Sequence, residues 1–149
     1  MGLCTVDPGV SPFLYTIGKE NTDSASFFAF ILNAVGVGWL HRGDFLVLDN
    51  AQLHSGGCAN IMQEYLWYYE SPFDGLPLNI FVVPFPTRSP ELNPIELLWG
   101  ILVRRLKVLP LDMQLYRGEG LMHASCEIMN NFTRTDVVKC FNKQGYYCK

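Results

Sequence analysis

Two polar loops, each after an apolar run, carry the side chains best suited to chemistry. The first loop, Asp49-Asn50-Ala51-Gln52-Leu53-His54, follows the apolar run 45–48. The second, Ser89-Pro90-Glu91-Leu92-Asn93-Pro94-Ile95-Glu96, comes shortly after the apolar run 79–83. If the two runs are neighbouring strands, their carboxyl ends lie at the edge where open α/β sheets place ligands. Asp49 and Glu96 could then face one cleft.

Carboxylates that converge on one cleft are typical ligands of hard divalent cations such as Mg²⁺. Two such ions, about 3.5–4 Å apart, stabilise the attacking and leaving oxygens in phosphodiester cleavage. The fold alone explains the same residues equally well. An Asp-Asn pair after a strand commonly closes an Asx-turn, and Asn93 followed by Glu96 has the spacing of a helix capping box. The residues by themselves leave both interpretations open.

The elements that would position these loops follow from hydrophobic periodicity and from turn residues. We expect strands at 13–17, 45–48 and 79–83, a first helix that ends at Gly36, and further helices at 58–69, 94–108 and 135–142. The side chain of Thr22, Asp23 or Ser24 would cap the first helix, and Pro94 would begin the third. The run 45–48 is apolar at every position, which is typical of a strand covered on both faces. Alternating strands and helices predict an α/β layer architecture.

Composition excludes several classes of protein. The chain has 149 residues, which predicts one domain, and 49% of them are hydrophobic. A net charge of −3 with only 17% charged residues argues against a disordered tail or a polybasic arm. The longest apolar stretch, 27–40, is too short to span a membrane, so no membrane partner is expected. Five cysteines without framework spacing suit free thiols in the nucleus or the cytoplasm.

The amino-acid sequences of the two loops resemble motifs of a known family. "LVLDNAQLH" and "FPTRSPELNPIELLW" resemble the catalytic domain of mariner-type transposases of the DDE superfamily. The resemblance is firm over 44–106 and extends over most of the chain. It implies a ribonuclease H-like mixed sheet flanked by helices. It also implies a DNA endonuclease and strand-transferase of cut-and-paste transposition, acting in the nucleus, or in the cytoplasm of a prokaryote. By motif matching, Asp49 and Glu96 are the second and third carboxylates that hold Mg²⁺ or Mn²⁺.

The family's first carboxylate lies on a strand well upstream of the Asp-Asn pair, whereas only 48 residues precede Asp49 here. We therefore expect residues 1–149 to be an N-terminally truncated, partial domain that lacks the first strands. Asp7 is the early carboxylate weighed as a substitute. Metal binding is then expected to be weak or lost and the fragment inactive. The alternative is a non-catalytic DNA- or protein-binding module. Exposed apolar strand edges would invite self-association or pairing with a full-length transposase.

Further residues near the two loops have supporting roles in this interpretation. His54 could orient Asp49, with Asn50 beside it, although a structural imidazole explains His54 as well. Basic side chains around the second loop could contact DNA phosphates without reading sequence. The basic residues are Arg88, Arg104, Arg105 and Lys107. The alternative for them is the solvated face of a helix.

Overall fold

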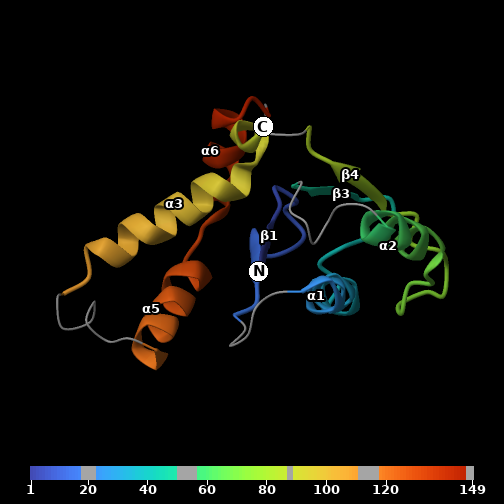
Figure 1. Ribbon diagram of the computed structural model, residues 1–149, viewed down its shortest axis with the longest axis horizontal. Helices are drawn as coiled ribbons and strands as arrows, with labels where there is room; N and C mark the ends of the chain where they lie inside the picture. The colour runs from blue at the N-terminus through green and yellow to red at the C-terminus, as the bar shows by residue number, and fades with distance from the viewer. Residues whose placement is uncertain (18–22, 50–56, 87–88, 111–117, 147–149) are drawn as a thin grey trace. The chain divides into compact units, whose positions relative to one another are not determined.

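The computed structural model describes residues 1–17, 23–49, 57–86, 89–110 and 118–146, with side chains of the second helix from residue 60 onward. The chain folds into two compact units (Figure 1). The first unit comprises Met1 and residues 18–90, and the second comprises residues 2–17 and 91–149. The mixed α/β class is confirmed, while the single domain over 1–149 stays a prediction.

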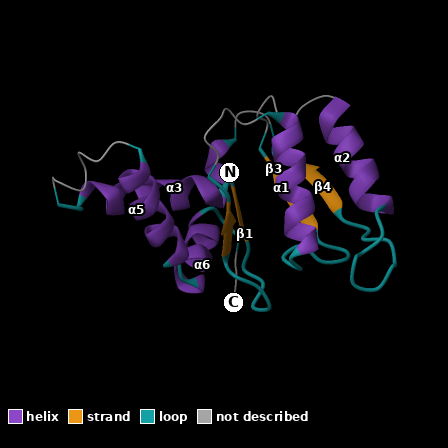
Figure 2. Cartoon of the chain, turned by 90° about the horizontal axis from the view of Figure 1, so that it is seen from below, coloured by secondary structure: helices purple, strands orange, loops and turns teal. Residues whose placement is uncertain are grey.

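Over its described residues, the first unit consists of two helices and a two-stranded parallel sheet. In chain order these are α1 (Ser24–Gly36), β3 (Phe45–Leu48), α2 (Gly57–Tyr68) and β4 (Phe81–Pro84). In the register of the sheet, Phe45 pairs with Phe81 and Leu48 with Pro84. Both helices lie on the same side of the strands (Figures 1 and 2). The predicted helices and strands of this region are thus confirmed, with shifts of one or two residues at their ends.

Asp23, one of the three predicted caps, begins α1, and it does so in a capping box with Ser26. The Asp23 carboxylate accepts a hydrogen bond from the Ser26 N–H at 2.7 Å, and the Ser26 hydroxyl oxygen accepts one from the Asp23 N–H at 3.0 Å. These two bonds satisfy two backbone donors that a helix start leaves without partners. The side chains of α1 buried in this unit are Phe27, Phe30, Ile31, Ala34 and Val35.

The expectation that the strand 45–48 is covered on both faces is wrong. Leu46 and Leu48 are buried, but Phe45 is 68% exposed and Val47 is 43% exposed. The physical reason is that α1 and α2 both pack on one side of the sheet, so one face of β3 stays open (Figure 2). On that open face the rings of Phe45 and Phe81 stack, with centroids 5.0 Å apart.

In the described part of the second unit, α-helices pack with a hairpin. The hairpin pairs β1 (Gly2–Cys4) with β2 (Phe13–Tyr15) in antiparallel fashion. The helical part comprises α3 (Pro94–Lys107), α5 (Glu119–Asn130) and α6 (Arg134–Lys143), and the short helix η1 (Pro90–Leu92) begins at the last residue of the first unit. Its buried core consists of Phe13, Leu98, Met129, Phe132, Val137 and Cys140. The predicted strand 13–17 and helices 94–108 and 135–142 are confirmed, whereas β1 and α5 were not predicted.

One arginine joins the hairpin to the last helix. The guanidinium of Arg134, at the start of α6, donates to the backbone carbonyls of Val6, Asp7 and Val10 in the loop between β1 and β2. Because one guanidinium binds three backbone carbonyls, this loop is fixed against the start of α6. None of the helices within the described ranges is long and apolar enough to cross a membrane.

Candidate functional site

Asp49 lies directly after β3, at the carboxyl end of the parallel sheet. Its side chain is partly buried. The strand pairing continues to this point, because the Phe85 N–H donates to the Leu48 carbonyl at 2.7 Å. Asp49 therefore stands at the sheet edge where parallel α/β sheets place ligands. Three other predicted site residues, Asn50, His54 and Arg88, lie outside the described residues.

Glu96 occupies the first turn of α3, and its side chain is exposed. Asn93 caps this helix alone: its side-chain oxygen accepts from the Ile95 N–H at 3.3 Å. Among the residues that the structure describes, none donates a hydrogen bond to the Glu96 carboxylate. The capping box that would have explained Glu96 through the fold is therefore not formed. A carboxylate in this position is still stabilised, because the N-terminus of a helix favours negative charge.

The other side chains of the second loop build the start of α3. Asn93 is only 8% exposed, and Leu98 is fully buried. The ring of Trp99 meets Phe13 edge-on, with centroids 5.4 Å apart. A side-chain carbon at Gly2 would lie 2.9 Å from the same indole, so β1 passes very close to α3. Most side chains of the motif thus pack within the fold, whereas Glu96 lies at the surface.

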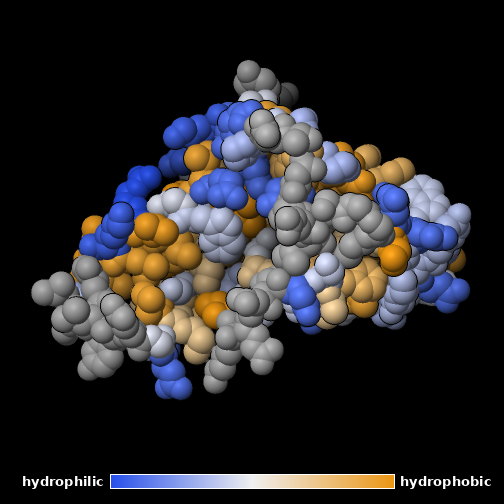
Figure 3. Space-filling model, viewed as in Figure 1, coloured by the Kyte–Doolittle hydropathy of each residue, from blue (hydrophilic) through white to orange (hydrophobic). Residues whose placement is uncertain are grey.

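An exposed stripe continues from Glu96 along α3. Residues 96, 100, 103 and 107 are spaced by four, three and four, which places them on one face of a helix. Arg104 flanks this face, and all of these positions are exposed. Figure 3 shows hydrophilic residues along the outer edge of α3 and apolar ones where it lies beside α5. We call Glu96, Gly100, Val103, Arg104 and Lys107 the α3 stripe.

The two neighbouring arginines of α3 differ in their surroundings. Arg105 points to α6, where its guanidinium pairs with the Asp136 carboxylate at 3.2 Å and lies over the Phe132 ring. Arg104 is exposed, and within the described ranges it has no hydrogen bond or ion pair. Arg104 is therefore available to an external anion, whereas the charge of Arg105 is already partly neutralised.

Comparison with known families decides the class of this chain. Residues 5–112, which include both polar loops and all of α3, match the family model of the DDE superfamily endonucleases. The chain belongs to the DDE superfamily endonucleases. No curated protein and no solved structure matches it. The match confirms a DDE transposase-type domain, a family whose substrate is DNA, and it ends before α5.

DDE endonucleases usually use a divalent metal, and the donor types of Asp49 and Glu96 suit one, since Mg²⁺ prefers carboxylate oxygens. Asp49 belongs to the first unit and Glu96 to the second. Within the described parts of the chain, no three His, Cys, Asp or Glu side chains are grouped so that they could hold a metal ion. The carboxylate of Asp7, weighed as a substitute ligand, accepts from the Gly9 N–H at 2.7 Å and closes the hairpin turn.

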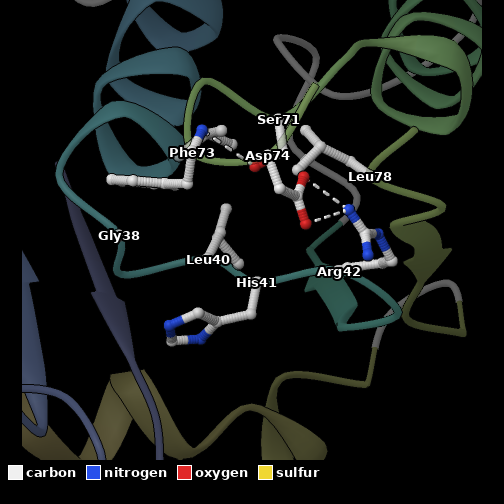
Figure 4. Close-up of a pocket in the computed structure, with 9 residues that line it drawn as sticks. Gly38, Leu40, His41, Arg42, Ser71, Phe73, Asp74 and Leu78 are labelled. Carbon is white, nitrogen blue, oxygen red and sulfur yellow. Dashed lines mark hydrogen bonds and ion pairs between the residues drawn. The ribbon is translucent and has the colours of Figure 1, made fainter. Parts of the chain in front are cut away.

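A pocket of about 430 Å³ in the first unit lies apart from these residues (Figure 4). It is formed by the turn after α1 and by the loop that leads to β4. Arg42 in this wall binds both carboxylate oxygens of Asp74 at 2.6 Å. The N–H of Leu76 and then this arginine keep the pKa of Asp74 below its ordinary value. The two charges neutralise each other, so the ion pair holds the loop in place.

Proposed function

We propose that this chain is the catalytic part of a mariner-type DDE transposase with a ribonuclease H-like sheet. Asp49 and Glu96 would be its second and third metal-binding carboxylates, and Mg²⁺ or Mn²⁺ its cofactor. Such ions activate the attacking oxygen and stabilise the leaving oxygen when a phosphodiester bond is cut. The substrate would be DNA, and the protein would act in the nucleus, or in the cytoplasm of a prokaryote.

The observation that carries this proposal is the exposure of the Glu96 carboxylate to solvent. In the motif around it, Asn93, Leu98 and Trp99 all serve the fold, but the Glu96 carboxylate has no bond within the described residues. We explain this solvent-facing carboxylate, in the first turn of α3 of an endonuclease family, as a ligand held ready for a cation. Asp49, at the carboxyl end of β3, stands where such folds place the other ligand.

Contacts to the DNA backbone would come from the basic residues near Glu96. Arg104 is our first choice, because it is exposed on the α3 stripe and has no partner among the described residues. Lys107 and Arg88 would add to it, and Arg105 would contribute less because Asp136 already neutralises part of its charge. We assign supporting roles near Asp49 to Asn50 and His54. Contacts of this kind position DNA without reading its sequence.

Two carboxylates hold a pair of metal ions weakly, since such sites use ligands from several segments. Asp7 closes its own turn through the Gly9 N–H, and we do not assign it as the third ligand. We therefore propose that residues 1–149 form a partial domain with only slow activity alone. Mapping the 5′ end of the transcript tests this: an in-frame apolar strand with an Asp upstream of Met1 would support a truncated domain. A transcript that begins at this Met would favour a binding role.

The alternative function is a non-catalytic DNA- or protein-binding module derived from a transposase. One observation favours it, namely that within the described residues no group of three side chains could hold a metal ion. Such a module would keep the phosphate contacts of Arg104 and Lys107 but would cut nothing.

Nicking of supercoiled plasmid DNA in Mn²⁺ separates the two functions. The proposal predicts slow nicking that stops with EDTA and in the variants Asp49→Asn and Glu96→Gln. The matched controls are Glu91→Gln, an exposed carboxylate of the same motif, and Glu64→Gln on the surface of α2. DNA binding without nicking by the unchanged chain would support the module instead. Nicking that persists in both Asp49→Asn and Glu96→Gln would overturn the assignment of the site.

A further inference from the structure

We propose that Tyr146, which follows α6, positions Glu96 by holding the loop from which α3 begins. The inference rests on the proposed function, because it takes Glu96 as a metal ligand. Tyr146 lies outside the residues 5–112 that match the family. Leu92, Glu96 and Tyr146 all belong to the second unit, so the contact lies within one compact part of the chain.

The hydroxyl of Tyr146 binds the backbone just before α3. It donates a hydrogen bond to the Leu92 carbonyl at 3.0 Å. The first carbonyl that α3 itself uses is that of its N-cap, Asn93, which accepts from the Glu96 N–H at 3.2 Å. The Leu92 carbonyl precedes the helix, so its partner must come from outside the helix. Tyr146 supplies this partner and ties the residue before the N-cap to the end of α6.

The end of α6 fixes the place of Tyr146. Gly145 adopts a left-handed φ of +89°, which glycine does without steric cost. The Tyr146 N–H donates to the Phe141 carbonyl at 3.0 Å. The Gly145 N–H donates to the Asn142 carbonyl at 3.1 Å. These two bonds form a Schellman motif, and the Tyr146 and Phe141 rings meet with centroids 5.6 Å apart. The hydroxyl is therefore held by a defined helix end.

The helix that carries Tyr146 is itself packed on α3. Val137 of α6 and Leu98 of α3 are fully buried in the same core. Arg105 of α3 pairs with Asp136 of α6 at 3.2 Å. Because these contacts fix α6 against α3, the hydroxyl of Tyr146 holds the loop in a set place.

The start of α3 depends on this contact because its own bonds are long. Asn93 accepts from the Ile95 N–H at 3.3 Å and from the Glu96 N–H at 3.2 Å, whereas such bonds usually measure about 2.9–3.0 Å. Leu92 is joined directly to Asn93, so the Tyr146 hydroxyl limits the movement of the cap. Burial raises the pKa of Tyr146, so the hydroxyl keeps the proton that it donates at neutral pH. Glu96 thus stands on a helical turn that is anchored at its first residue.

The variant Tyr146→Phe isolates the hydroxyl, because it keeps the ring beside Phe141. The matched control is Tyr15→Phe in the same unit. The Tyr15 hydroxyl donates to the Asn130 side chain at 2.8 Å and to the Cys126 carbonyl at 3.2 Å, so it joins β2 to α5. Titration with Mn²⁺, followed by electron paramagnetic resonance, gives the affinity of each folded protein. Tyr146→Phe should bind Mn²⁺ about fivefold more weakly than the unchanged chain, the scale of one hydrogen bond. Tyr15→Phe should bind as the unchanged chain does.

Amide hydrogen exchange of Ile95 gives a second measurement, which needs no metal. This N–H is the one that the Asn93 side chain caps. In Tyr146→Phe it should exchange at least about threefold faster, because the cap opens more often. In Tyr15→Phe its exchange rate should not change.

The two measurements separate this inference from the proposed function. Mn²⁺ binding that depends on Glu96 but is equally strong in Tyr146→Phe would overturn the positioning role and leave the proposed function standing. Equal weakening in both tyrosine variants would also overturn it, since a general loss of stability would then explain the effect. If the unchanged chain binds no Mn²⁺ through Glu96, the proposed function fails and the exchange of Ile95 decides. Faster exchange in Tyr146→Phe would support the anchoring of α3, and an equal rate would refute it.

Discussion

The side chain of Asn93 accepts a hydrogen bond from the Ile95 N–H, and this single bond caps α3. Both other capped helices with an acidic or hydroxyl N-cap, α1 and α6, use a reciprocal box instead. In α3 the residue that could return the second bond, Glu96, faces solvent. Asn93 therefore stabilises the start of this helix, and Glu96 is left available for chemistry.

The first prediction follows directly from this separation. Asn93→Ala should lower the free energy of unfolding by about 1 kcal/mol, the usual cost of losing an N-cap. Glu96→Gln should change it by less than about 0.5 kcal/mol, as for a surface substitution without partners. Urea denaturation of both variants checks this. A large loss of stability in Glu96→Gln would return Glu96 to a purely structural role.

A second prediction distinguishes the two arginines of α3. Arg105→Ala should destabilise the fold by about 1 kcal/mol, because it loses the Asp136 pair and the Phe132 ring. Arg104→Ala should leave stability unchanged but weaken DNA binding. It should also reduce the slope of the logarithm of the binding constant against the logarithm of salt concentration by about one. Fluorescence anisotropy with a labelled duplex, at several salt concentrations, measures the second effect. Equal DNA affinity in Arg104→Ala and the unchanged chain would contradict the phosphate contact.

The third prediction concerns pH. Burial opposes the ionisation of Asp136, but hydrogen bonds from Thr133 and then the Arg105 pair outweigh it, so the pKa of Asp136 lies below its ordinary value. A lowered pKa in the folded state stabilises the protein above the unfolded pKa of about 4, and this contribution disappears as the pH falls through the folded value.

The variant Asp136→Asn isolates this group, because the amide can still accept from Thr133 but carries no charge. The unchanged chain should be more stable than Asp136→Asn at pH 7, and the difference should shrink by pH 3. Urea unfolding of both proteins at the two pH values gives the comparison. A difference that does not depend on pH would show that the charge of Asp136 is not stabilising.

A fourth prediction uses Gly100 on the α3 stripe. A side-chain carbon built at this position meets nothing within 4 Å. Glycine in a helix interior costs about 0.5–1 kcal/mol relative to alanine, so Gly100→Ala should raise the free energy of unfolding by that amount. Thermal or urea unfolding measures the gain. A loss of stability would mean that α3 is more closely packed at this point than the structure shows.

Sequence patterns predicted the elements whose ends carry strong local signals. Asp23 before α1 and Pro94 at the start of α3 are such signals, and α6 begins one residue before its predicted start. The helix α5 was missed because its N-cap is Gly118, which offers no side-chain cap. The short β1 was missed because its three residues are too few to show an alternating pattern.

The part of the site that depends on local motifs was predictable from the sequence. The motifs in the two loops indicated the DDE family, which the match over residues 5–112 confirms. The role of Arg105 was out of reach, because its partner Asp136 lies 31 residues away and only tertiary packing brings them together. The open face of β3 was likewise hidden, since an apolar run does not tell how many helices cover the strand.

The central claim is that Asp49 and Glu96 are metal ligands, and Mn²⁺ binding tests it most directly. Titration of the chain with Mn²⁺, followed by the loss of the free-ion signal in electron paramagnetic resonance, gives the affinity without any need for activity. We expect Asp49→Asn and Glu96→Gln each to weaken binding at least about tenfold, since even the loss of a residue that only hydrogen-bonds a metal ligand has an effect of that size. Glu91→Gln should bind as the unchanged chain does. Equal Mn²⁺ affinity in all four proteins would contradict the account.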